Sequence, residues 1–251
     1  MTLLCQCPLL KVFALRHPEM FTPAALEHVS HLTELIKLDF SLRPGDFRPL
    51  LPLRKPEFLA VGGTPMDAAM LEQLRQLPEL RFTLPQSGGR VDFSSFPKLK
   101  RVGLLNEGIT VGMVESLAAL KGLESLTINV PGKVDPAVIS QIAKSLRGLT
   151  SLSLTLDQPL TGRAPLSELA SLPKLAAVTL GNHTGINQFD DAALLNLEGV
   201  VSLKFIKIET LQHRMTKQGL ADFRKRLPDV KIEGTGLAAA VDSKPTNTAA
   251  P

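Results

Sequence analysis

Cysteines and histidines are the residues of this chain best suited to bind a metal ion. Cys5 and Cys7 are one residue apart. His28 and His31 are three apart and would share one face of a helix. A zinc site needs about four ligands; His17, the nearest histidine to the cysteines, lies beyond the first expected strand, and no acidic residue joins the histidine pair. We interpret Cys7 as a core residue and the histidines as solvated, and expect no metal site.

Paired carboxylates and paired glycines are the next candidates for chemistry. Asp190 and Asp191 directly precede the apolar run AALLNL, so capping of a helix explains them. The glycine pairs at 62–63 and 88–89 match neither a P-loop nor a dinucleotide fingerprint, and we expect turns there. No nucleophile, base and orienting group stand at a recognisable spacing. The sequence therefore predicts a non-catalytic protein without a cofactor.

The composition argues against nucleic-acid and membrane partners. The formal net charge is +4, the basic residues are spread along the chain, and there is no Trp or Tyr to stack on bases or sugars. The densest basic group, Arg224 to Arg226, falls at the end of an expected helix, where it favours the helix dipole. No apolar stretch is long enough to cross a bilayer. We therefore expect neither nucleic acid nor a membrane as partner.

The cysteine content and the N-terminus indicate the cellular compartment. Two cysteines cannot staple a secreted scaffold of 251 residues, which favours a reducing environment. The first residues lack the basic region and the cleavage site of a signal peptide. The sequence therefore predicts a cytoplasmic protein.

An apolar repeat dominates the chain. Each copy has an anchor, an apolar residue three positions later and another after two more, and the anchors are 21 to 27 residues apart. The copies are Leu10-Phe13-Leu15, Leu35-Leu38-Phe40, Pro56-Leu59-Val61, Leu77-Leu80-Phe82, Leu99-Val102-Leu104, Leu123-Leu126-Ile128, Leu149-Leu152-Leu154, Leu175-Val178-Leu180, Val200-Leu203-Phe205 and Leu227-Val230-Ile232. The register of the copy at Pro56 is uncertain by one residue. The last two apolar residues of a copy share one face of a short strand, and stacked copies can bury that face together.

Helix-start chemistry recurs between the apolar copies. An N-cap residue precedes a proline at Thr22-Pro23, Thr64-Pro65 and Asp135-Pro136, and Thr110 and Asp190 or Asp191 resemble further caps. Most repeats are therefore expected to read strand, loop, helix. The proline-rich residues 42–56 and the turn-rich residues 85–97 break this rule, so we expect a less regular N-terminal half.

These features resemble a known family. Runs such as LASLPKLAAVTL and LAALKGLESLTI, and the closing TKQGLADFRKRLPDVKIEG, are similar to irregular leucine-rich repeat proteins of the ribonuclease-inhibitor-like type, as found in bacteria, over residues 1–234. The resemblance implies an α/β, right-handed solenoid of about ten repeats, with parallel strands on a concave face that binds proteins. The family often has Asn, Cys or Thr eight residues after the anchor. In this chain the residue type at that position differs from repeat to repeat, so we expect the turn geometry to vary as well.

The two ends of the chain differ from its middle. Cys7 occupies the position that Leu172 takes in a later repeat, and no capping segment precedes it. We hypothesise that the chain begins inside a longer repeat array. Residues 235–251 are small and polar, and we expect a flexible tail there.

The residues that flank the second apolar position of each copy are expected on the concave face. The candidate protein-binding residues are Lys37, Asp39, Glu79, Arg81, Arg101, Ser125, Thr127, Ser151, Ser153, Thr179 and Lys204. Lys37, Arg81 and Arg101 favour an acidic partner. The sequence thus predicts a protein-interaction module; the alternative is an arm of a larger multi-domain protein whose activity lies elsewhere.

Overall fold

A computed structural model describes most of the repeat region. The described residues are 7–15, 23–41, 53, 58–62, 79–83, 93–105, 109–130, 134–156, 165–181, 189–209 and 215–234. The expectations for Cys5, Thr22, Thr64, most of the proline-rich segment and the tail at 235–251 fall outside these residues.

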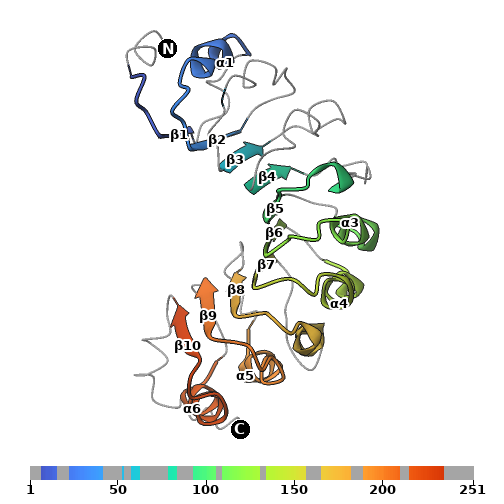
Figure 1. Ribbon diagram of the computed structural model, residues 1–251. Helices are drawn as coiled ribbons and strands as arrows, with labels where there is room; N and C mark the ends of the chain where they lie inside the picture. The colour runs from blue at the N-terminus through green and yellow to red at the C-terminus, as the bar shows by residue number, and fades with distance from the viewer. Residues whose placement is uncertain are drawn as a thin grey trace, which may run out of the picture.

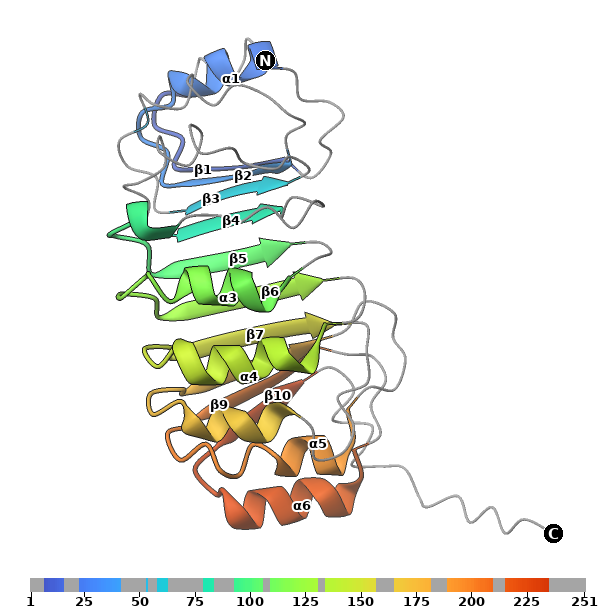
Figure 2. The ribbon, with the colours of Figure 1, turned by 90° about the vertical axis from the view of Figure 1, so that its right-hand side faces the viewer.

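One parallel sheet forms the inside of a curved solenoid (Figures 1 and 2). Its ten strands follow one another in sequence order. They are β1 Val12–Leu15, β2 Lys37–Ser41, β3 Phe58–Gly62, β4 Glu79–Thr83, β5 Arg101–Leu105, β6 Ser125–Val130, β7 Ser151–Leu156, β8 Ala177–Gly181, β9 Phe205–Glu209 and β10 Lys231–Gly234. The predicted α/β solenoid with parallel strands is therefore confirmed.

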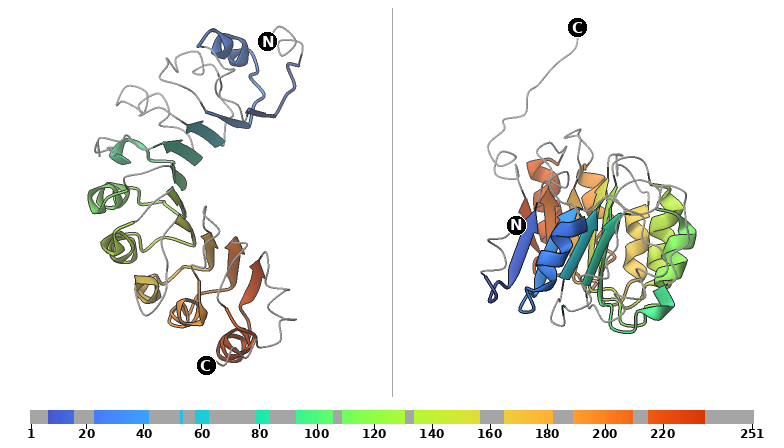
Figure 3. Two further views of the ribbon diagram at one scale, coloured as in Figure 1. Left: turned by 180° about the vertical axis from the view of Figure 1, so that it is seen from behind. Right: turned by 90° about the horizontal axis from the view of Figure 1, so that it is seen from above.

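Helices cover the outer, convex side of the sheet, as the view from behind also shows (Figure 3). The α-helices are α1 Pro23–Ser30, α3 Val111–Leu117, α4 Pro136–Ser145, α5 Asp191–Leu195 and α6 Lys217–Arg226. In the described part of the chain, two 3-10 helices, η4 Phe93–Ser95 and η5 Pro165–Ser171, take the same place in their repeats. Because all of them lie on one side, the other face of the sheet carries no described helix.

The predicted helix caps are confirmed where they are described. The side chains of Thr110, Asp135 and Asp190 each accept a hydrogen bond from a backbone N–H in the first turn of α3, α4 and α5. Asp190 is thus the cap, and Asp191 is the first helical residue. Thr216 caps α6 in the same way. Such caps typically contribute about 1 kcal/mol each and fix where each helix begins.

Alternating side chains of the strands build the core. In β7, Leu152, Leu154 and Leu156 are at most 1% exposed, whereas the residues between them are half-buried. The inner face of α4, including Val138 and Ile142, is fully buried behind the sheet. Neighbouring repeats thus complete a core that a single repeat cannot close.

A tight turn sets the register before β1, β2 and β5 to β10. In the seventh repeat, the N–H of Leu149 donates to the carbonyl of Leu146 at 3.0 Å. The carbonyl of the next residue, Thr150, then accepts from the N–H groups of both Ala176 and Ala177 in the following repeat, at 2.8 and 3.0 Å. The turn therefore places the anchor leucine and locks each strand to the next.

This turn corrects the sequence register of the ninth repeat. The N–H of Leu203 donates to the carbonyl of Val200 at 3.0 Å, so Val200 begins the turn and Leu203 is the anchor. Ile206 consequently pairs with Val178, and Ile208 pairs with Leu180. The predicted triplet Val200-Leu203-Phe205 was wrong by three positions. The error arose because two overlapping sets of apolar residues fit the same spacing.

The tenth repeat needs a similar correction, and the third needs none. The N–H of Val230 donates to the carbonyl of Leu227 at 3.2 Å, so Val230, predicted as a strand residue, closes the turn. Ile232 pairs with Ile206 as the inward strand residue. In the third repeat, Leu59 pairs with Leu38 and confirms the chosen register.

Cys7 departs from its predicted place in the core. It is exposed, whereas Leu172, at the matching position of a later repeat, is 1% exposed. Leu172 lies in the eighth repeat, between the seventh and ninth along the sheet. Cys7 precedes β1, the first strand of the sheet, where the described residues provide a neighbouring repeat on one side alone.

Close packing between α5 and α6 generates a prediction about Gly219. A Cβ at Gly219 would overlap the Asp191 carboxylate, which accepts hydrogen bonds from the N–H and hydroxyl of Thr216 at 2.8 and 2.7 Å. Gly→Ala in a helix ordinarily stabilises by about 0.5–1 kcal/mol. We expect Gly219→Ala instead to destabilise by about 1–3 kcal/mol in chemical denaturation. Gly112→Ala in α3, where the nearest atom is 3.9 Å away, is the control and should stabilise. Equal stabilisation by both changes would contradict the packing.

Candidate functional site

The concave face consists of the outward strand residues opposite the buried rows. Residues at matching positions of adjacent strands are paired, so they form continuous rows along the solenoid. The predicted residues that occupy these rows with described side chains are Lys37, Glu79, Arg101, Ser125, Thr127, Ser151, Ser153 and Thr179. Asp39 and Arg81 hold outward register positions, and their side chains lie outside the described part.

Lys204 is the predicted residue that the structure moves off the concave face. It precedes β9, and its N–H donates to the carbonyl of Ala176 at 2.8 Å. The outward residues of β9 are Phe205 and Lys207, which pair with Ala177 and Thr179. Sequence reasoning missed both because it placed this repeat three residues too early. The signal was present, since Leu203, Ile206 and Ile208 fit the repeat equally well.

The centre of the concave face is neutral and lined by small side chains. We call its outward residues on β6 to β8 the hydroxyl patch; they are Ser125, Thr127, Asn129, Ser151, Ser153, Thr155, Ala177 and Thr179. All are half-buried. At the rim, a Cβ on Gly181 would lie 3.0 Å from Oγ1 of Thr155, so this position leaves little room for a side chain.

An ion pair occupies the concave face beside the hydroxyl patch. Nε of Arg101 donates to Oε2 of Glu79 on the adjacent strand at 2.5 Å. The Glu79 side chain is 13% exposed, whereas that of Arg101 is 52% exposed. From the sequence, the positive charge of Arg101 was expected to attract an acidic partner. In the structure, Glu79 already neutralises that charge.

Paired charges also occupy the C-terminal end of the concave face. Lys207 contacts Glu209 and Lys231 contacts Glu233, each with an Nζ–Oε1 distance of 2.5 Å. Glu233 is the cross-strand neighbour of Lys207. The hydrogen bond and the charge of Glu209, with a smaller effect of Glu233, raise the pKa of Lys207 above 10.5. The concave face thus has a neutral centre between two groups of paired charges.

The described residues offer little outside this face for small-molecule chemistry. Within them, no three His, Cys, Asp or Glu side chains come together as metal ligands. A shallow, open hollow is lined by Glu198, Arg226 and Leu227, and Arg226 donates to both carboxylate oxygens of Glu198. No helix in the described part of the chain is long and apolar enough to cross a membrane.

The corrected ninth repeat generates a stability prediction. Ile206 is fully buried, whereas Phe205 is half-buried on the concave face. We expect Ile206→Ala to lower the free energy of unfolding by about 2–5 kcal/mol. Phe205→Ala should cost about 1 kcal/mol, because less of its surface leaves water on folding. Chemical denaturation of both variants measures the difference, and a larger loss for Phe205→Ala would restore the earlier register.

The charge pair on β9 generates a prediction about pH. Glu209→Gln should lower the pKa of Lys207 toward 10.5, as followed by NMR of the lysine side chain. Because pairing raises the folded-state pKa, its contribution to stability is present below 10.5 and is lost as pH rises through the raised value. An unchanged Lys207 titration would exclude Glu209 as the cause.

Comparisons with known proteins find likeness at the level of solved structures. No family model and no curated protein sequence matches the chain. Internalin C2 from Listeria monocytogenes is 19% identical over 75% of this chain and 84% of its own, with a TM-score of 0.41. TLR13, in a complex with ssRNA13, is 15% identical over 92% of this chain and 36% of its own, with a TM-score of 0.46. PEPR1 with AtPEP1 is 14% identical over 83% and 36%, with a TM-score of 0.37.

The fold is therefore assigned from the sequence and structure of this chain, and not from its neighbours. TM-scores below 0.5 carry no argument about site or partner. The apolar repeat, the turn before the strands and the sequential parallel sheet are features of one architecture. The chain therefore has the fold of an α/β leucine-rich repeat solenoid.

Proposed function

We propose that the chain is a non-catalytic interaction module that binds a protein partner through its concave face. The observation that carries this proposal is the hydroxyl patch, a neutral surface of small side chains on three adjacent strands. The described helices lie behind the sheet and leave this face accessible. We place the module in the cytoplasm because of its cysteine content.

Small hydroxyl side chains suit recognition of a polypeptide. Each Ser or Thr hydroxyl can donate one hydrogen bond and accept others, so Ser151 and Thr127 can serve either N–H or C=O groups of a partner. Short side chains lose little conformational freedom on binding and let a partner backbone approach closely. The patch therefore favours a neutral, polar segment of the partner.

The ends of the concave face would add orientation. Arg101 and Glu79 already neutralise each other's charge. A partner would therefore bind this pair through hydrogen bonds and not through an opposite charge. Charges at the rim of an interface mainly affect association rate and specificity, and the affinity would come from the centre.

A capture experiment with matched variants tests the proposal. The bait would carry Ser125→Arg with Thr179→Arg, which fill the hydroxyl patch without touching the buried rows. The control bait would carry Ala137→Arg with Ala192→Arg, at exposed helix positions with the same added charge. Partners captured from native cell extract would be quantified by mass spectrometry. We expect a partner that wild type and control capture and the patch variant loses by at least tenfold. Equal capture by both variants would place the binding site elsewhere.

A further inference from the structure

A second surface runs along the side of the solenoid where the strands begin. We call it the turn edge, and it contains the tight turn and the residue after it in each repeat, as in residues 120–124, 146–150 and 172–176. Because every strand runs in the same direction, these turns all lie on one side of the sheet (Figure 2). The turn edge is therefore separate from the concave face and from the convex helices.

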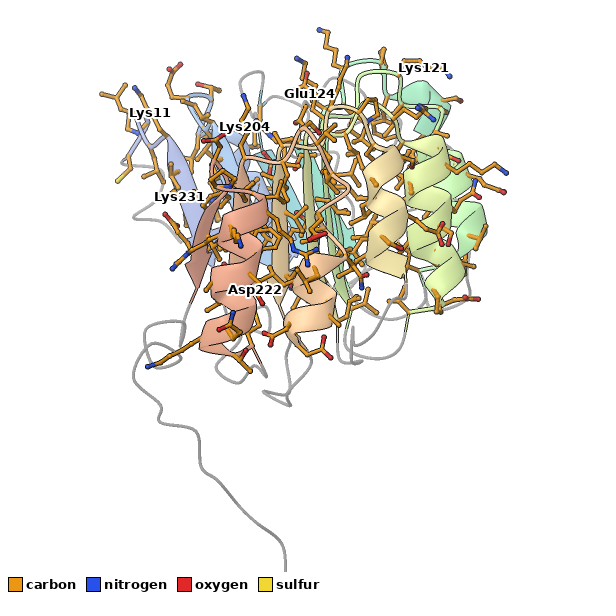
Figure 4. The ribbon with its side chains drawn as sticks, turned by 90° about the horizontal axis from the view of Figure 1, so that it is seen from below. Lys11, Lys121, Glu124, Lys204, Asp222 and Lys231 are labelled. Carbon is orange, nitrogen blue, oxygen red and sulfur yellow. The ribbon has the colours of Figure 1, made fainter. Side chains whose placement is uncertain are left out.

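Basic residues recur along the turn edge. Every one of the five segments before β5 to β9 carries at least one exposed cation; these are Lys98, Lys100, Lys121, Arg147, Lys174 and Lys204. The same five segments hold one carboxylate, Glu124, which contacts Lys100 at 3.0 Å. Figure 4 shows Lys11, Lys121, Glu124 and Lys204 at the same side of the molecule.

Among the described residues, ion pairs account for only one of these cations, Lys100. Within the described part of the chain, Lys121, Arg147 and Lys174 form no ion pair, in contrast to the paired charges of the concave face. Lys144 and Arg224 lie in the last turns of α4 and α6, where the helix dipole favours them. The turn-edge cations lie outside the helices, and they leave a row of positive charge facing solvent.

Exposed aliphatic side chains accompany this charge. Val201 is 89% exposed in the turn before β9, and Leu9 is 79% exposed in the turn before β1. These are two of the three large hydrophobic residues that the described chain leaves exposed. Aliphatic side chains that project among cations suit a surface with anionic groups above an apolar layer.

We propose that the turn edge binds the surface of an anionic lipid membrane. The lysines and Arg147 contact lipid phosphates, while Val201 enters the boundary between headgroups and acyl chains. Each basic residue near such a surface contributes about fivefold to binding. A nucleic acid offers no apolar layer for Val201, and the chain has no Trp or Tyr to stack on bases. Peripheral binding of this kind needs no spanning helix, and it leaves the concave face open to a protein partner.

Binding to vesicles tests the charge contribution. The full chain would be sedimented with vesicles of phosphatidylcholine alone or with one-third phosphatidylglycerol. The test variant is Lys121→Glu with Lys174→Glu. The control is Lys217→Glu with Ala137→Glu and Ala192→Glu, at exposed positions in the first turns of α6, α4 and α5, away from the turn edge. Both change the net charge by −4, from +4 to 0. We expect wild type and control to bind anionic vesicles in a salt-dependent way, and the test variant to bind at least tenfold more weakly.

A single tryptophan tests which surface meets the membrane. The chain has no Trp, so Val201→Trp introduces one reporter on the turn edge, and Ala137→Trp introduces one at the exposed start of α4. Anionic vesicles should shift the emission of the first variant to the blue and leave the second unchanged. The proposal is overturned if wild type does not bind anionic vesicles, if the test and control variants bind equally, or if duplex DNA binds while vesicles do not.

Discussion

The stacking of two inward apolar side chains per strand is the interaction on which the structure depends. Leu126 and Ile128 lie beside Leu152 and Leu154, and these lie beside Val178 and Leu180. Each buried side chain contributes about 1.5–3 kcal/mol, but only when the neighbouring repeat covers it. Because strand side chains alternate, the same register that buries one row presents the other row to solvent. Core and binding surface are therefore set together.

Much of the fold could be predicted from the sequence because its signals are local. The anchors from Leu99 to Leu175 and the caps Thr110, Asp135 and Asp190 each follow from a few adjacent residues. The ninth repeat was misplaced where Val200 and Leu203 both suit an anchor, since spacing alone cannot rank them. The hydrogen bonds of the turn decide between them. Cys7 was misjudged because burial depends on a neighbouring repeat, which a local pattern does not report.

The candidate site was predictable in position and less so in charge. Alternation along the strands gave the outward register positions of Ser125, Thr127 and Ser151, and those of Ser153 and Thr179, but the sequence analysis did not include Asn129 and Thr155 near the strand ends. It did not reveal that Arg101 is compensated by Glu79, because the two residues are 22 positions apart and meet only through the sheet. For the same reason the basic residues of the turn edge looked scattered along the chain. Stacking brings them into one row, and the low overall charge of +4 conceals it.

The solenoid thus has two candidate binding surfaces, the concave face and the turn edge. The register of β9 beside β8 determines which residues of the ninth repeat lie on each of them. Contacts between these strands, observed by NMR in a protein labelled at its isoleucine, leucine and valine methyl groups, test that register most directly. The structure predicts contacts from Ile206 to Val178 and from Ile208 to Leu180. Contacts that pair Leu203 with Val178, with none from Ile206 to Val178, would contradict it. They would return Lys204 to the concave face and move Lys207 away from it.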